Sequence, residues 1–136
     1  MPAPPDPPRL VNTQRFFMNV SEDRIDDVIH LLSPDVTYTV PGRSSLSGVC
    51  HGPAEVRSHL AQLFAFTRGT YDVLKWVDWL VGETHVAAYQ YTQMQRNGII
   101  YRGHQMFLVQ TDHNDALSDI RVLFENEEDA GRFFSN

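Results

Sequence analysis

The chain has 136 residues, 42% of them hydrophobic and 21% charged, and its formal net charge is −6. This length and composition predict one soluble globular domain with its own core, and the acidity disfavours nucleic acid or an anionic membrane surface as a partner. Cys50 is the only cysteine, which excludes an intrachain disulfide, and the six histidines show no metal-ligand spacing on one element. We therefore expect neither a metal nor another cofactor.

The first ten residues, "MPAPPDPPRL", hold five prolines and precede the domain, which we expect to span residues 11–136. Such a proline-rich segment predicts a disordered or extended tail, and it has neither the basic nor the apolar region of a signal peptide. No apolar run in the chain approaches the roughly 20 residues that cross a bilayer. These features favour a cytoplasmic protein.

Two short helices are predicted at the start of the domain. The first, at about 12–20, carries Phe16 and Phe17 on one face. Ser21 is predicted to cap the N-terminus of the second, because its hydroxyl can accept a free amide of the next turn. The second helix should stop before the segment 33–35, "SPD".

An irregular polar stretch follows the first predicted strand. Residues 36–40, "VTYTV", alternate as a strand with Tyr38 and Val40 on one face. The next stretch, "PGRSSLSG", lacks the lysine ending of a phosphate-binding loop. Pro53 then suits the first turn of a third helix, where a missing amide costs nothing. We interpret the irregular stretch as the flexible lip of a pocket.

Four long strands are predicted in the second half of the chain, at 71–81, 84–96, 99–110 and 116–125, before a short amphipathic helix. Asn97-Gly98 is the strongest hairpin signal. The order ααβαββββα predicts an α+β fold, with a strongly curved antiparallel or mixed sheet whose concave face the N-terminal helices cover. The cone-shaped pocket between them would be the default small-molecule site.

Three segments carry a resemblance to a known family: "SPDVTYTVPGRSSLSGVCHGPAEVRSHL", "VDWLVGETHVAAYQYTQMQRNG" and "DALSDIRVLFENEEDAGRFF". They resemble the SnoaL-like polyketide cyclase branch of the nuclear transport factor 2-like superfamily, over nearly everything after residue 10. The resemblance implies the cystatin-like α+β cone. The superfamily includes isomerases, cyclases, epoxide hydrolases, dehydratases and binding modules, so the fold does not fix the chemistry.

Positions at which relatives keep catalytic groups are occupied differently here. Where steroid isomerases of this fold have a phenol, a base aspartate and an acid, the resemblance aligns Phe16, Val40 and Met106. Where limonene epoxide hydrolases have an arginine and two carboxylates, it aligns His104, Met106 and about Val122. Both chemistries therefore lack their carboxylates in this chain.

His104 and Asp119 are the nearest equivalents of the histidine and aspartate that SnoaL-type cyclases pair. His104 lies on a mostly apolar strand face, where a neutral imidazole can move a proton near neutral pH. The alternative is a histidine satisfied by a backbone carbonyl or placed at a dimer face. Asp119 would favour the charged imidazolium, but alternation places Ile120 and Val122 in the hollow and Asp119 outside it, unless a bulge intervenes.

Tyr38 and Asp78 are the other two candidate catalytic residues. The Tyr38 phenol would either donate to a substrate carbonyl or simply fill space. Asp78 shares a strand face with Trp76 and Leu80, and burial there would raise its pKa. A solvent-facing position on an edge strand is an equal alternative for Asp78.

The strand before the Asn97-Gly98 turn presents two alternating faces. Counting back from the turn, we predict Gln90 and Met94 in the pocket, and Tyr89 and Tyr91 on the convex face, where they would form a homodimer. The other predicted substrate-binding residues are Phe16, Val40, Phe64, Met106, Ile120 and Val122.

Together these features predict a cofactor-independent enzyme that performs acid–base chemistry on a hydrophobic, oxygenated small molecule, such as a polyketide- or terpenoid-type intermediate. The reaction would be a cyclisation, an isomerisation or a dehydration. Two alternatives stay open at this point. One is a module that binds such a molecule without converting it, and the other is an epoxide-opening cyclase or hydrolase with Asp78 as its acid.

Overall fold

The structure, a computed structural model, describes residues 5–135. Within them the chain forms helices and strands in an order close to the predicted one, with one additional strand, β2, and a single 3-10 turn, η1. The elements are α1 (Pro8–Ser21), α2 (Ile25–Val28), η1 (Ile29–Leu31), β1 (Leu32–Val40), β2 (Gly48–His51), α3 (Gly52–Phe66), β3 (Asp72–Val81), β4 (His85–Arg96), β5 (Ile99–Thr111), β6 (Leu117–Phe124) and α4 (Glu127–Phe134).

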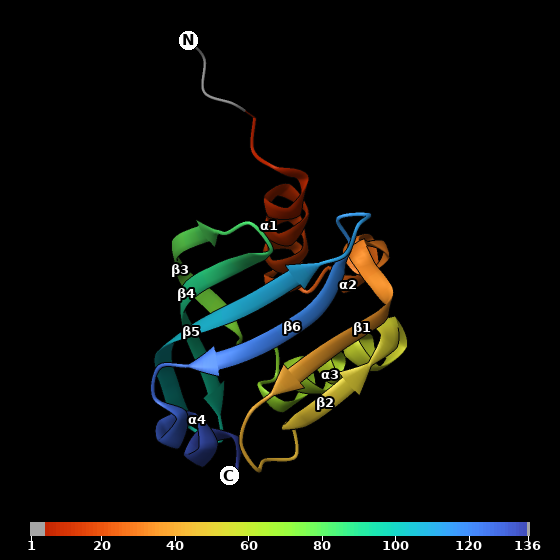
Figure 1. Cartoon of the computed structure of the whole chain (residues 1–136). Coiled ribbons are helices and arrows are strands. Elements are labelled where there is room, and N and C mark those ends of the chain that lie inside the picture. The colour runs from red at the N-terminus through yellow and green to blue at the C-terminus, as the bar shows by residue number, and fades with distance from the viewer. Residues whose placement is uncertain (1–4, 136) are drawn as a thin grey trace.

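The strands form one curved, mixed sheet in the order β2-β1-β6-β5-β4-β3. β1 runs parallel to β6, and the other neighbours are antiparallel. α1 and α3 cover one face of this sheet, which we call the inner face, while α4 lies at the end where β6 finishes (Figure 1). The opposite face is called the outer face. This arrangement confirms the predicted α+β fold class.

The N-terminal helix begins earlier than predicted. α1 starts at Pro8, so residues 8–10 are helical and do not belong to an extended tail, while residues 1–4 of the predicted tail lie outside the described part of the chain. A proline in the first helical turn costs nothing there, because that amide has no partner in any helix. A run of prolines can therefore lead directly into a helix.

Ser21 was wrongly predicted as a helix N-cap. It ends α1, and its hydroxyl donates to the Met18 carbonyl at 2.8 Å. The second helix is only one turn long, Ile25–Val28, and has no side-chain cap. The chain then enters β1 at Leu32, so that the predicted stop signal 33–35 is already part of a strand.

The β4–β5 hairpin fixes which side chains reach the inner face. Asn97 and Gly98 both have positive φ, 51° and 79°, as the tight turn requires. From that turn the two strands pair without a register shift, and each even-numbered residue of β4 lies opposite an odd-numbered residue of β5. Gln90 therefore pairs with Gln105, and the side chains of both residues are buried on the inner face.

Aromatic side chains anchor α1 to the sheet. The Phe17 ring stacks on Phe107 of β5 with centroids 4.4 Å apart, and Phe16 packs edge-on against Phe17 at 5.1 Å. All three side chains are buried. A second, smaller apolar cluster lies where α4 packs against the sheet, and α4 itself contributes three of its members. The cluster contains Leu46, Met94, Tyr101, Ala130, Phe133 and Phe134.

Candidate functional site

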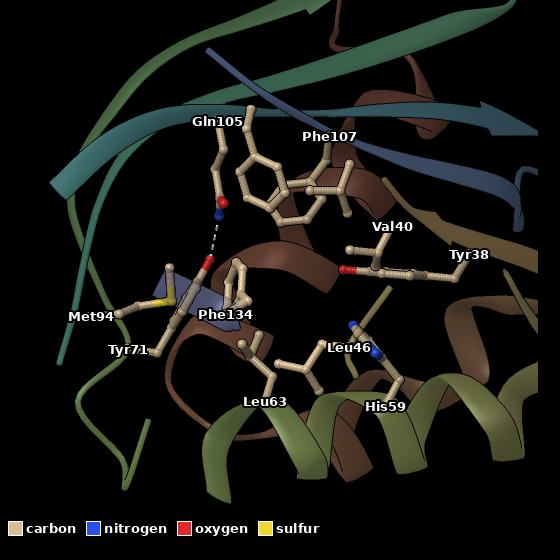
Figure 2. Close-up of a pocket in the computed structure, with 12 residues that line it drawn as sticks. Tyr38, Val40, Leu46, His59, Leu63, Tyr71, Met94, Gln105, Phe107 and Phe134 are labelled. Carbon is tan, nitrogen blue, oxygen red and sulfur yellow. Dashed lines mark hydrogen bonds between the residues drawn. The ribbon is translucent and has the colours of Figure 1, made fainter. Parts of the chain in front are cut away.

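The main cavity lies between the inner face of the sheet and α3, near the end that α4 closes (Figure 2). It encloses about 380 Å³ of atom-free space, counting its opening, and only a small part of this is wide enough for a water molecule. Most of its wall is apolar. The lining residues are Tyr38, Val40, Leu46, His59, Leu63, Tyr71, Met94, Gln105, Phe107, Val122, Phe124 and Phe134.

A second cavity of about 350 Å³ adjoins the main one on the side of α1. Tyr38, Leu63, Tyr71 and Phe107 line both, so they form the boundary between the two spaces. The second cavity is also bounded by α1 and by the inner side of β4; its further lining residues are Phe16, Phe17, Val20, Ser21, Leu60, Phe64 and Gln90.

A polar group is built into this apolar surface, and we call Tyr71, Gln90 and Gln105 the amide–phenol cluster. The Tyr71 hydroxyl oxygen accepts the Gln90 Nε2 amide at 2.7 Å and the Gln105 Nε2 amide at 2.9 Å. Figure 2 shows the second of these bonds, with the Tyr71 hydroxyl directed towards Gln105. Burial raises the pKa of Tyr71, an effect that the two amide hydrogen bonds partly oppose, so the phenol stays protonated at neutral pH.

Tyr38 and His59 form a second polar pair on the other side of the main cavity (Figure 2). Their rings lie 5.2 Å apart, tilted by 45°, and both side chains are buried. Burial raises the pKa of the Tyr38 phenol and lowers the pKa of the His59 imidazole below its ordinary 6.5. At neutral pH the pair therefore consists of a neutral phenol and a neutral imidazole, which can accept a proton.

The lip, residues 41–47, borders the mouth of the main cavity. Serine side chains hold it in shape: the Ser47 hydroxyl donates to the Pro41 carbonyl at 2.9 Å, and the Ser44 hydroxyl accepts the Leu46 amide at 3.2 Å. Leu46 is its one buried side chain and enters the cavity wall. Leu46 and His59 also line a wider surface cleft between the lip and α3, so they separate the cavity from solvent.

Many of the predicted site residues do line these cavities. Tyr38 borders both of them, so its predicted position at the hollow is correct. Ile120 points to the inner face but is fully buried in the core and lines neither cavity. The predicted substrate-binding residues that line one of the two cavities are Phe16, Val40, Phe64, Gln90, Met94 and Val122.

The prediction that His104 projects into the hollow was wrong. His104 pairs with Tyr91 across the β4–β5 ladder, and its ring lies on the outer face, 4.7 Å from the Tyr91 ring and 5.4 Å from the Tyr89 ring. Its Nδ1 atom is 2.9 Å from Glu125 Oε2, and 37% of the side chain is exposed. The reason is the hairpin register, which turns His104 outward when Gln90 turns inward.

Asp119, Asp78 and Met106 also lie away from the cavities. The Thr37 hydroxyl donates to Asp119 at 2.5 Å, and Arg121 pairs with the same carboxylate. Met106 shares the outward parity of His104, so its predicted place in the pocket was wrong. Asp78 is exposed and accepts the Trp79 amide at 2.8 Å, next to a register shift in β3. The epoxide-opening alternative thereby loses its proposed acid.

Three residues of the main cavity wall were not among the predicted site residues: His59, Tyr71 and Gln105. His59 could have been found, because it follows Val56 by three positions and lies on the buried stripe of α3. Gln105 is the cross-strand partner of Gln90 and follows from the hairpin turn. Tyr71 lies in the connection before β3, where no periodicity signals its direction.

Residues 5–135 contain neither a group of metal-ligating side chains nor a membrane-spanning helix. No three or more His, Cys, Asp or Glu side chains there are grouped so that they could hold a metal ion. None of the helices formed by those residues is long and apolar enough to cross a membrane. The same residues do provide the two cavities and their polar groups, which are the candidate functional site.

Comparison with known proteins gives one family match and several structural neighbours. A family model described as "SnoaL-like domain" matches residues 13–114, while no curated protein sequence matches. Bal32a, from a soil-derived mobile gene cassette, is 16% identical, with a TM-score of 0.87 over 93% of this chain and 96% of that one.

Two further neighbours were solved with a small molecule. TerC, co-crystallised with polyporic acid, is 14% identical, with a TM-score of 0.76 over 88% of this chain and 92% of that one. A Mycobacterium tuberculosis protein in complex with estradiol-17β-hemisuccinate is also 14% identical, with a TM-score of 0.74 over 91% of this chain and 97% of that one. At these identities the likeness establishes the fold alone.

Proposed function

Because the chain belongs to the SnoaL-like domain family, we propose that its inner cavities bind a mostly apolar small molecule with a carbonyl oxygen and that His59 moves a proton of this molecule. The observation that carries the proposal is the composition of the main cavity wall. Apolar side chains surround a neutral imidazole and two protonated phenols, those of His59, Tyr38 and Tyr71.

The chemistry that suits these groups is enolisation. A neutral imidazole removes a proton from the carbon next to the carbonyl, and a phenol donates a hydrogen bond to the oxygen as negative charge develops on it. The resulting enolate can be reprotonated at another carbon, attack a second carbonyl, or expel a leaving group. Isomerisation, cyclisation and dehydration are therefore the reaction classes in question.

The molecules bound by two neighbours support the polarity proposed for the ligand. The neighbours' ligands, polyporic acid and a steroid ester, are oxygenated and largely apolar molecules. The wall of the main cavity here is of the same mixed kind, with Val40, Leu63 and Val122 beside the phenols. A polyketide- or terpenoid-type intermediate fits this description.

A second candidate function is binding without conversion. The lack of carboxylates at the site favours it, since no Asp or Glu among the described residues lines either cavity. Propiophenone separates the two functions, because its CH₂ group next to the carbonyl exchanges hydrogen for deuterium only when an enol forms. Accelerated exchange in D₂O supports an enzyme, and binding without accelerated exchange supports the module.

Tyr71→Phe should weaken the binding of propiophenone about two- to tenfold, because a donor to the ligand carbonyl is lost. The Gln90 and Gln105 amides also lose their acceptor. Isothermal titration measures the dissociation constant. Tyr101→Phe is the matched control, since the Tyr101 hydroxyl is buried without a hydrogen-bond partner in the described structure and lines neither cavity. Equal affinity in both variants would argue against a ligand oxygen at Tyr71.

We also propose that the outer face forms a homodimer interface. Tyr89, Tyr91 and His104 pack together there, and Leu123 beside them is 46% exposed. Such an apolar aromatic surface is favourable to bury against a second copy. Sedimentation of the wild type should give about twice the 15.6 kDa of one chain, whereas Tyr91→Glu should sediment as a monomer and Tyr91→Phe as a dimer. A monomeric wild type would refute the interface.

A further inference from the structure

The Gln90 side chain carries an unpaired polar atom inside the protein. Gln90 is 1% exposed, and its Oε1 atom has no hydrogen-bond partner among residues 5–135. Its Nε2 atom is bonded to the Tyr71 hydroxyl, so the side chain is held in place with its carbonyl end free. Gln90 lines the second cavity, next to the boundary that Tyr71 forms with the main one.

Two groups of the amide–phenol cluster bear on ligand recognition, the Tyr71 hydroxyl hydrogen and Gln90 Oε1. The Tyr71 oxygen accepts both amides, which uses its two lone pairs, and its own hydrogen has no acceptor among the described residues. Gln90 Oε1 is the second of these groups. If the Gln90 amide is turned round, Oε1 accepts the Tyr71 hydrogen but Nε2 loses its acceptor. In both orientations the cluster keeps a buried polar group unpaired.

From this geometry we infer that the ligand carries a hydroxyl group on the carbon next to its carbonyl, as in an α-hydroxy ketone or its enol form. The inference rests on the proposed function, because it concerns the same cavities. The ligand carbonyl accepts the hydrogen of Tyr71, and the ligand hydroxyl donates to Gln90 Oε1. Two oxygens on neighbouring carbons suit two protein groups that already share a hydrogen bond.

The inference has a consequence for selectivity. A buried acceptor that stays without a hydrogen bond in the complex weakens binding. A ligand that donates a hydrogen bond to this acceptor therefore binds about 5- to 100-fold more tightly than a ligand that does not. A simple ketone satisfies Tyr71 alone. An α-hydroxy ketone satisfies Tyr71 and Gln90 together, so Gln90 acts as the specificity-determining residue.

The test compares 2-hydroxyacetophenone with propiophenone, two ketones of nearly equal shape in which OH replaces CH₃. Dissociation constants are measured by isothermal titration, and their ratio, propiophenone over 2-hydroxyacetophenone, is the readout. In Gln90→Leu this ratio should fall at least fivefold from the wild-type value, because an apolar side chain has no acceptor to pair. Gln110→Leu, on the exposed outer side of β5, should keep the wild-type ratio.

The outcomes separate this inference from the proposed function. If both ketones bind and the ratio is the same in wild type and Gln90→Leu, the hydroxyl is not recognised by Gln90 and the inference is overturned alone; a water molecule then pairs the cluster. If neither ketone binds the wild type, both proposals are overturned. Should Gln90→Leu fail to fold in a melting experiment, Gln90→Met, which keeps an unbranched chain, takes its place with the same expected fall.

Discussion

His59→Gln should slow the deuterium exchange of propiophenone by about 100- to 10,000-fold, the usual contribution of a positioned general base. His59 is buried in the wall of the main cavity, and glutamine retains a polar side chain there without its basicity. The affinity for propiophenone should change by less than about threefold, because the apolar wall and Tyr71 are kept. Proton NMR in D₂O measures the exchange, and titration measures the affinity.

The matched control is His104→Gln on the outer face, which should leave the exchange rate at the wild-type value. Two results would contradict the assignment. Wild-type exchange in His59→Gln would mean that the protein binds without acting as a base through this residue. A loss of exchange in His104→Gln would return the chemistry to the outer imidazole, against the position that the structure gives it.

The rate of exchange should also depend on pH in a defined direction. Burial lowers the pKa of His59 below 6.5, so the imidazole is mainly the free base at pH 7 and the rate should level off above that pH. As the pH falls through the lowered pKa, the imidazole is protonated and the rate declines. The same group makes the folded state lose stability on acidification, from pH 6.5 downward, because the unfolded chain takes up its proton first.

Phe17→Ala should lower the free energy of unfolding by about 3–5 kcal/mol, the usual cost of removing a buried phenylalanine side chain. Phe17 is 3% exposed, stacks on Phe107 and holds α1 against the sheet. The loss also enlarges the second cavity, which the remaining side chains cannot fill completely. Urea denaturation followed by circular dichroism gives the change from the midpoint and the slope.

Met18→Ala provides the control for this substitution, since Met18 is the next residue of α1 and is 47% exposed. Its effect should stay within about 0.5 kcal/mol. Phe17→Leu should fall between the two, because leucine restores part of the buried apolar volume. If Phe17→Ala were as mild as Met18→Ala, the packing of α1 on β5 would not contribute to stability as described.

The sheet was predictable because its signals are local. Each predicted strand of the second half lies within one residue of the observed one at both ends, since alternation and the Asn97-Gly98 turn act over a few residues. The same turn also fixes the face of the sheet on which the His104 side chain lies. Once Gln90 is assigned to the inner face, pairing across the hairpin sends His104 to the other face, so the two predictions excluded each other.

The rest of the site depended on contacts that are distant in the sequence. Tyr71 joins the site through Gln90 and Gln105, which are 19 and 34 positions away. The resemblance to cyclases directed attention to a histidine on the penultimate strand, whereas the cavity histidine is on α3. Such a shift of a chemical group between elements of one fold is outside what strand and helix periodicity can indicate.

The internal bonding of the lip bears on how fast a ligand is exchanged. Residues 41–47 keep their shape through hydrogen bonds of their own serines, and two glycines have positive φ there: Gly42 within the lip, at 98°, and Gly48 directly after it, at 126°. Leu46 is the one side chain of this segment that is buried, so an opening of the lip would have to expose it. Exposing one leucine costs about 2 kcal/mol, which would make the open form about thirtyfold rarer than it would be without that side chain.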